Sequence, residues 1–249
     1  MADAWNAAVA GFLVDRDPPP EFQQWASSYK GTGRGSVERD ALPEPFLGRL
    51  SRQARVVFLA LNPGRADLSF QGRDGIFAQE IRRAGSYAAW AASWPYLRDP
   101  WVGTKGKNQH HSTRLQFVRT WVGDPHLDHN AMVSFELYPW HSTAITGRMH
   151  PDPAVIEEFV WRPVAELAAP VFAFGKPWFR VLEQDLGLEV VDRLGAGGRK
   201  YGSTVASRSV VVLKSLNGVT VIAEKHMGGA GPPRREETVL LRQALSDWL

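Results

Sequence analysis

The stretch ARVVFLALNPGR, residues 54–65, places a continuous apolar run directly before a turn. Short apolar runs of this kind, bounded by turn residues, are typical of strands that are buried on both faces of a sheet. Asn62-Pro63-Gly64 ends the run, because proline and glycine favour a sharp change of chain direction. We therefore predict a central strand over 54–61 whose carboxyl end carries the Asn62 side chain.

Two further apolar runs, at 131–137 and 170–175, have the same form as the first. Segments with helical spacing or helix start signals lie between and after them, at 75–85, 114–122, 152–167 and 176–187. A hairpin around Asn217-Gly218 and a closing helix within 232–249 complete the pattern. Strands that alternate with helices predict an α/β fold, a three-layer α/β/α sandwich with a mostly parallel central sheet.

The 249 residues contain no internal repeat and no low-complexity linker, which favours a single domain over 1–249. Within that domain we expect an N-terminal helical extension over 1–50 and a loop-rich insertion over 93–113.

The composition excludes several classes of site. The sequence has no cysteine, so disulfides, cysteine zinc sites and cysteine-ligated iron–sulfur clusters are ruled out. The net charge of +3 and the pI near 9.3 are compatible with nucleic-acid binding without being diagnostic of it. The N-terminus lacks the basic start of a signal peptide, and no apolar run approaches about 20 residues. We expect a cytoplasmic monomer with no membrane segment.

Four polar segments follow the predicted strands, and they are where ligand contacts are expected. In parallel α/β sheets ligands bind beyond the carboxyl ends of the strands. The first segment carries the Asn62 amide, and the last begins at His226 and continues as a glycine-rich stretch. Backbone N–H groups of such a stretch can hold a phosphate, and Arg234 and Arg235 add positive charge nearby. These segments are NPGR (62–65), ELYPWHS (136–142), GKPW (175–178) and EKHMGGAGPP (224–233).

The order and spacing of these segments resemble the uracil-DNA glycosylase superfamily, and most closely its single-strand-selective and mismatch-specific branches. Residues 60–64, Ala-Leu-Asn-Pro-Gly, match the Gly-x-Asn-Pro-Gly motif of those branches. Phe77 matches the aromatic residue that stacks on the flipped base, and 136–139 matches an Asn-x-x-Pro-like strand end. VFAFGKPW (171–178) matches a Val-Gly-Lys-like strand and turn of the family, and His226 matches the histidine of its His-Pro-Ser-Pro-type final loop. The likeness covers the chain from about residue 55 to the C-terminus.

The resemblance implies a monofunctional DNA glycosylase with no metal and no cofactor, acting on double- or single-stranded DNA. Asn62 would position the attacking water, and His226 would stabilise the departing base; these are the two expected catalytic residues. Base-binding residues would be Glu136, Phe77, Ala60 and Leu61. DNA-binding residues would be Gly64, Arg65, Lys176, Gly228, Gly229, Arg234 and Arg235.

Glu136 is the departure from the family that carries most information. The family usually has asparagine there, whose amide both donates and accepts hydrogen bonds, whereas an ionised glutamate only accepts. Such a carboxylate repels the O4 atom of uracil and favours an exocyclic amine such as cytosine N4. We therefore expect a modified, cytosine-like base in preference to uracil, in repair or in defence against modified foreign DNA. Two milder departures are Ala60 for glycine and Met227-Gly228-Gly229 for Pro-Ser-Pro.

Three alternative readings remain open. Glu136 can be a structural carboxylate paired with an arginine, such as Arg65 or Arg73, because burying a lone charge is costly. A metal-dependent hydrolase is a second reading, although HLDH (126–129) lies in a proline-containing loop rather than on one helix face. Its candidate ligands are His110, His111, His126, His129, His141 and His150. A catalytically inactive DNA-binding module is the third, and His110 and His111 would suit its contact surface.

Overall fold

The computed structural model describes residues 1–196, 198, 200–201, 208–226 and 231–248; of His226 it describes the backbone only. Within this part of the chain one seven-stranded sheet runs through the molecule, in the order β1-β3-β2-β4-β7-β6-β5. The four central strands are parallel to one another. They are β3 (Met132–Glu136), β2 (Val56–Ala60), β4 (Val171–Phe174) and β7 (Thr220–His226). The predicted parallel core is thereby confirmed, and Ala60 pairs with Glu136 at its carboxyl edge.

Antiparallel strands complete both edges of the sheet. The predicted hairpin is present, since β6 (Arg208–Lys214) pairs with β7 and Gly218 takes a φ of 79° in the connecting turn. Two strands were not predicted: β1 (Phe46–Leu47), and β5 (Glu189–Gly195). The first has only two residues, and the second lies half exposed at the sheet edge and lacks a continuous apolar run.

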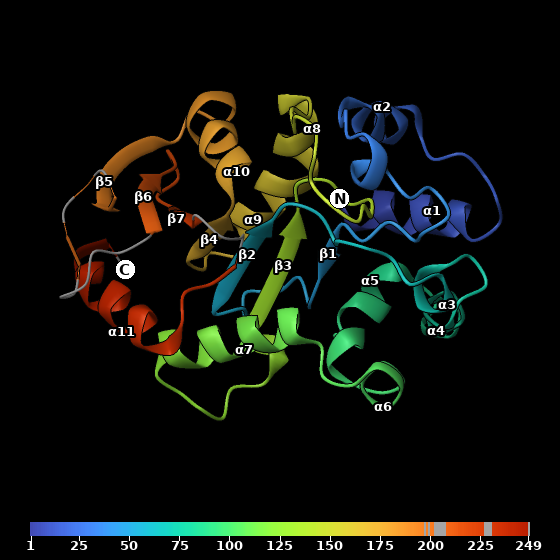
Figure 1. Ribbon diagram of the computed structural model, residues 1–249, viewed down its shortest axis with the longest axis horizontal. Helices are drawn as coiled ribbons and strands as arrows, with labels where there is room; N and C mark the ends of the chain where they lie inside the picture. Colours follow the sequence, from blue (N-terminus) through green and yellow to red (C-terminus); the bar gives the residue numbers. More distant parts are fainter. Residues whose placement is uncertain (197, 199, 202–207, 227–230, 249) are drawn as a thin grey trace.

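Helices cover both faces of the sheet (Figure 1). On one face, α7 (Gln109–Val122) packs against α11 (Arg235–Ala244), and Phe117 of α7 contacts Phe58 and Phe172 of the sheet. On the other face lie the two helices predicted at 152–167 and 176–187. Each of them is continuous and contains a π-helical stretch. The first consists of α8 (Pro153–Ile156), the π-helical stretch Glu157–Trp161 and α9 (Arg162–Glu166). The second consists of α10 (Lys176–Arg180) and the π-helical stretch Val181–Asp185.

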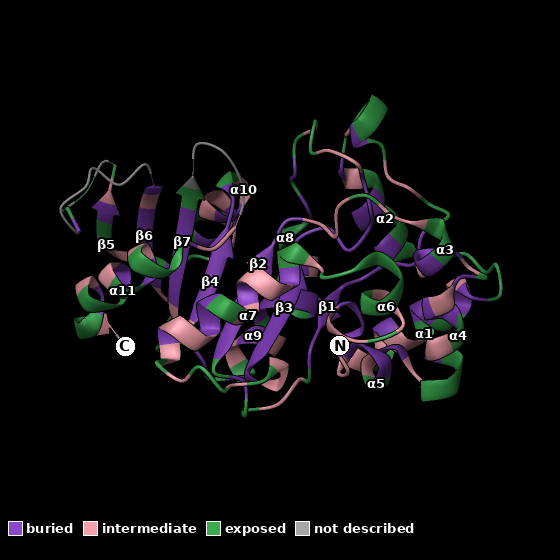
Figure 2. Cartoon of the chain, turned by 60° about the horizontal axis from the view of Figure 1, so that its bottom comes forward, coloured by how far each residue is buried: buried purple, intermediate pink, exposed green. Residues whose placement is uncertain are grey.

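The N-terminal region contributes to the same hydrophobic core as the sheet. Trp5 of α1 (Ala2–Phe12) stacks on Phe22 of α2 (Pro20–Ser28) with ring centroids 4.2 Å apart. The central strands β2, β3 and β4 are buried along their length (Figure 2). No helix in the described ranges is long and apolar enough to cross a membrane.

Residues 93–113 hold more helix than the expected loop-rich insertion. They include a short 3-10 turn (Pro95–Leu97), α6 (Trp101–Lys105) and the first turn of α7. α7 begins at Gln109 rather than at 114 because the Asn108 side chain caps it, accepting a hydrogen bond from the N–H of His111. Three more helices precede this segment: α3 (Leu68–Gln71), α4 (Ile76–Ala84) and α5 (Tyr87–Ala91).

Candidate functional site

A cavity of about 330 Å³ opens at the carboxyl ends of β2 and β3, the edge where ligands are expected. Its volume falls at the lower end of the range of roughly 300–1,000 Å³ found for small-molecule sites. The cavity brings together Asn62 and Glu136, two of the residues singled out from sequence, and also Gly64 and Arg65. The remaining lining comes from Glu44, Phe46, Leu47, Pro63, Gln71, Tyr96, Trp101, Asn108, His110 and His111.

The Asn62 side chain is held in one orientation by Ser142. Its Nδ2 atom donates to the Ser142 hydroxyl over 2.8 Å, and that hydroxyl donates in turn to the carbonyl of Ala144 over 3.1 Å. With the hydroxyl proton directed at Ala144, Ser142 accepts from Asn62, and this network places the Asn62 Nδ2 atom toward Ser142. The Asn62 oxygen Oδ1 is therefore the acceptor that remains for a ligand or a water.

The loop that carries Asn62 is fastened to the segment after β3. The Gly64 carbonyl accepts from the backbone N–H of Ser142 over 3.0 Å and lies 3.0 Å from Nδ1 of His141. Gly64 takes a φ of 84°, in the left-handed region that favours glycine, so this turn depends on that residue. His141 and Ser142 thus position Asn62, a role that their place in PWHS did not reveal.

Glu136 ends β3 and presents a buried carboxyl to the cavity. It is 7% exposed, and no side chain in the described part of the chain hydrogen-bonds its Oε2 atom. Burial raises the pKa of Glu136 to about 8, although the nearby charge of Arg114 opposes the shift. At neutral pH the carboxyl is mostly protonated and has both a donor and an acceptor atom.

The arginine close to Glu136 is Arg114, not the expected Arg65 or Arg73. Arg73 instead forms an ion pair with Asp15 at 2.7 Å, and Arg65 is exposed at the cavity mouth. Arg114 is fully buried, donates from Nη1 to Ser134 over 2.8 Å, and lies over the Phe58 ring. Its Nε and Nη2 atoms are buried and make no hydrogen bond within the described residues. The sequence indicates its burial through its spacing, which places Arg114 on the same helix face as Phe117 and Trp121.

A second buried carboxylate, Glu44, lies in the same cavity and belongs to a hydrogen-bond chain. The Tyr96 hydroxyl donates to Glu44 Oε1 and accepts from Gln71 Nε2 at 2.6 Å. Burial and the Glu44 charge raise the pKa of Tyr96, so its phenol stays protonated and donates. His141 Nε2 lies 3.3 Å from the same Glu44 oxygen. Glu44 lies in the loop LPEPF (42–46), where sequence alone shows only a charge between two prolines.

Phe77, the expected base-stacking residue, lies one layer behind the cavity. Its side chain is fully buried against Phe70, Trp90 and Tyr96, and it does not line the cavity. The ring of Trp101 lies in front of it, nearly parallel at a centroid distance of 5.9 Å, and is only partly buried. Phe46 and Tyr96 also line the cavity but are buried, so Trp101 is the most accessible of these three rings to a ligand.

Ala60 and Leu61 support the cavity from behind and do not line it. The Ala60 carbonyl accepts from the N–H of Leu137 and from the indole of Trp178, both over 2.9 Å. Leu61 is buried against Gly175, where a Cβ atom would lie only 2.7 Å from the leucine Cδ1 atom, so the close contact requires glycine. Both residues hold β2 in place beneath the Asn62 loop.

The remaining DNA-binding candidates are distributed along the same edge. Lys176 is exposed at the start of α10, and Arg234 and Arg235 are exposed at the start of α11. The His226 backbone pairs with Arg208 at the end of β7, which runs parallel to β4. Gly228 and Gly229 lie outside the described residues.

The histidines named for the alternative of a metal-dependent hydrolase are divided between the two edges of the sheet. His110 and His111 line the cavity and His141 lies beside it, whereas His126 and His129 precede β3 and so lie at its amino end. Among the described residues, no three or more histidine, aspartate or glutamate side chains are grouped closely enough to hold a metal ion. Burial lowers the pKa of His111, so it is a neutral cavity residue.

Comparison with known proteins does not identify a relative: no protein-family model matches the sequence. No curated protein matches it either.

Proposed function

We propose that this protein is a monofunctional DNA glycosylase that hydrolyses the N-glycosidic bond of a pyrimidine-type base flipped into the cavity. The observation that supports it most is that Asn62 and Glu136, an oriented amide and a carboxyl without a hydrogen-bond donor on Oε2, share one cavity at adjacent strand ends. Enzymes that act on a flipped base need a pocket that holds it by its hydrogen-bonding edge and its ring face. The resemblance of the strand-end motifs to the uracil-DNA glycosylase superfamily supports the same reaction.

In this proposal Asn62 places the attacking water near the anomeric carbon. Its Oδ1 atom accepts one water proton while Ser142 holds the other end of the amide. An amide is a weaker base than a carboxylate, so it orients the water rather than deprotonating it. His226 stabilises the negative charge that develops on the departing base, a role assigned from the order of the motifs.

Glu136 would read the 4-position of the pyrimidine, and its protonation state decides which base it accepts. The protonated carboxyl donates to a 4-oxo group, as an asparagine amide does, whereas the ionised form accepts from a 4-amino group. Because the pKa of Glu136 is raised to about 8, release of a 4-oxo base should fall as the pH rises through that value. Release of a 4-amino base should rise over the same range. Glu136→Gln, which donates and accepts at every pH, should abolish both trends.

The direct test measures base release from a panel of oligonucleotides, single-stranded and duplex, that carry uracil, cytosine, hydroxymethylcytosine or glycosylated cytosine. Abasic sites are detected by alkaline strand cleavage, and the released base is identified by mass spectrometry. We expect release of at least one pyrimidine in the presence of EDTA, with a modified cytosine preferred above about pH 8, where Glu136 is ionised.

The matched controls separate chemistry from folding. Asn62→Ala should strongly slow base release, whereas Asn130→Ala, at the amino edge of β3, should leave it intact. Binding to abasic DNA without release of any base from the panel would refute the glycosylase and favour an inactive binding module. Release that is lost with EDTA would favour metal-dependent hydrolysis.

A further inference from the structure

A second cavity, of about 290 Å³, forms a groove between α7 and the start of α11. Four cationic residues line it: Lys107, Arg119, Arg234 and Arg235. The other polar lining is neutral and rich in hydroxyl groups, from Ser112, Thr113, Thr120 and Thr238. No carboxylate belongs to the lining in the described part of the chain.

The two glutamates in the first turn of α11, Glu236 and Glu237, do not line this groove. Glu237 is engaged elsewhere, because its Oε1 atom accepts from Arg208 Nε at 3.2 Å and from the Tyr201 hydroxyl at 3.0 Å. Arg119 is held in place by a hydrogen bond from its Nε to the carbonyl of Leu127 over 2.8 Å. The groove is therefore a positively charged, hydroxyl-lined channel whose cations come from the loop before α7, from α7 itself and from α11.

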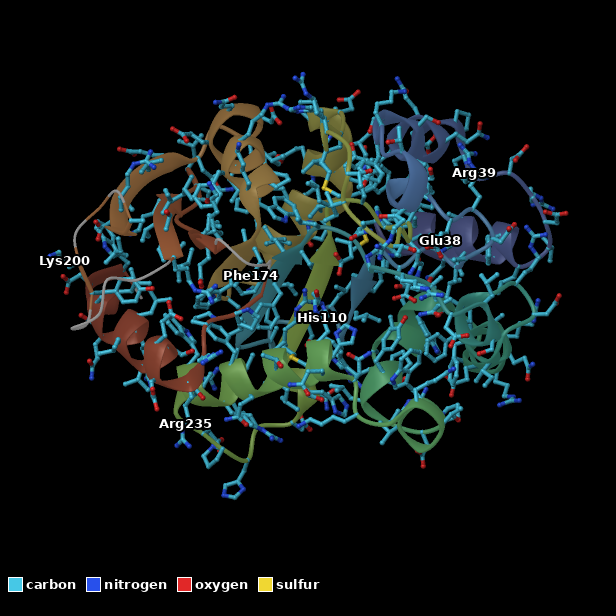
Figure 3. The ribbon with its side chains drawn as sticks, in the orientation of Figure 1. Glu38, Arg39, His110, Phe174, Lys200 and Arg235 are labelled. Carbon is cyan, nitrogen blue, oxygen red and sulfur yellow. The ribbon has the colours of Figure 1, made fainter. Side chains whose placement is uncertain are left out.

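The groove and the carboxyl-edge cavity share a wall. Lys107, Gln109 and Ser112 line the groove, and the intervening Asn108, His110 and His111 line the cavity. Figure 3 shows His110 at the amino end of α7 and Arg235 at the start of α11, where α11 meets α7. His110 itself is exposed, and the neighbouring charge of Arg114 lowers its pKa. Solvent around the exposed His110 ring weakens the influence of Arg114 on its pKa. The positive charge of the groove therefore comes from its lysine and three arginines rather than from His110.

We propose that this groove binds the phosphodiester backbone of the DNA strand whose base enters the cavity, which rests on the proposed function. Several cations spread along a channel suit the successive phosphates of one strand. A base that enters the cavity across the first turn of α7 leaves the adjoining phosphates of its own strand beside that turn. The contacts fix the position of the strand and carry no sequence information.

The test measures binding of a fluorescently labelled 16-nucleotide oligothymidine to the full-length protein by anisotropy, over a series of salt concentrations. Lys107→Gln combined with Arg235→Gln changes two exposed side chains of the groove. Each lost phosphate contact should reduce the slope of log affinity against log salt by about 0.7 for a single strand, so the double variant should lose about 1.4. Its affinity at low salt should fall about tenfold or more.

Arg52→Gln is the matched control, because Arg52 is exposed in the turn before β2, at the opposite edge of the sheet. It should bind the oligonucleotide as the wild type does, and Lys107→Arg with Arg235→Lys should retain most of the affinity. Thermal melting confirms that each variant is folded. An unchanged slope in the double variant, or an equal loss in Arg52→Gln, would overturn the proposal.

The same experiment separates failure of the groove from failure of the proposed function. If the groove variant loses binding while the wild type releases no base from any substrate, the groove is supported as a nucleic-acid site and the glycosylase is refuted. If the wild type releases a base and the groove variant binds and reacts normally, the glycosylase stands and the groove proposal is wrong.

Discussion

Two buried glutamates near the carboxyl edge of the parallel strands, Glu136 on β3 and Glu224 on β7, have similar electrostatics and different surroundings; β2 and β4 lie between them. Burial raises the pKa of each to about 8, and a buried arginine opposes the shift in both cases. Around Glu224, Arg208 places Nη1 3.2 Å from the carboxylate and also bonds Glu237 and the carbonyl of Gly231. Around Glu136, Arg114 bonds Ser134 instead, and the carboxyl faces an open cavity.

The difference shows that a raised pKa does not by itself identify a functional group. Structural ion-pair networks perturb pKa values as active sites do. Glu224 belongs to such a network, which fastens β6 and β7 to the start of α11. Glu136 is distinguished by the cavity in front of it, whereas the Glu224 carboxyl lies 3.2 Å from the Arg208 guanidinium and does not line that cavity. We therefore expect the network around Glu224 to control stability and the cavity at Glu136 to control chemistry.

The largest expected effect is on stability, at the Glu224 network. Arg208→Met should lower the free energy of unfolding by about 3–5 kcal/mol, because it leaves the buried Glu224 side chain without its cationic partner. Urea denaturation followed by tryptophan fluorescence measures this. A loss below about 1 kcal/mol would mean that the two regions do not differ as argued. Arg52→Met, at an exposed position, serves as the control.

The next effect is on chemistry, at the cavity. Asn62→Ala should slow base release by roughly 10²-fold or more, the cost of misplacing a reacting group. Ser142→Ala should also slow release, by a smaller factor, because it frees the Asn62 amide without removing it. Both variants should keep the wild-type melting temperature within a few degrees. Single-turnover kinetics provide the measurement, and a rate unchanged in Asn62→Ala would refute its role.

A smaller effect distinguishes the two aromatic residues near the cavity. Trp101→Ala should weaken binding of the target base by roughly 1–3 kcal/mol, the range for base–aromatic stacking. Phe77→Leu, in the layer behind, should lower stability while leaving affinity close to that of the wild type. Anisotropy with an oligonucleotide that carries the substrate base separates the two outcomes. The reverse pattern would return Phe77 to the role expected from sequence.

The smallest expected effect, counted per pH unit, is the pH dependence of stability. Since both folded-state pKa values lie above the ordinary glutamate value of 4.5, the folded protein holds protons that the unfolded chain releases. The stabilisation is complete below about pH 4.5 and is lost as the pH rises through about 8. Each group contributes at most about 1.4 kcal/mol per pH unit within that window. Glu136→Gln and Glu224→Gln should each flatten the curve, and an unchanged curve would contradict the pKa shifts.

The sequence predicted most of the sheet because buried strands are continuous apolar runs, and the three runs at 54–61, 131–137 and 170–175 are all strands. The same reasoning placed Asn62 and Glu136 at one edge, since parallel strands end on the same side. It did not find Arg114, Glu44 or Ser142. These three residues matter because they contact residues far away in the chain, and such contacts cannot be inferred from the local sequence.

By itself the sequence determined the α/β class, the parallel core of the sheet and the edge at which polar groups collect. These follow from apolar runs and turn residues, which act over a few neighbouring positions. Only the tertiary structure decided that Arg114 rather than Arg65 or Arg73 lies near Glu136, and that Trp101 rather than Phe77 faces the cavity. Those outcomes depend on how helices pack across the sheet, where differences of a few ångströms determine which side chain lines a cavity and which is buried behind it.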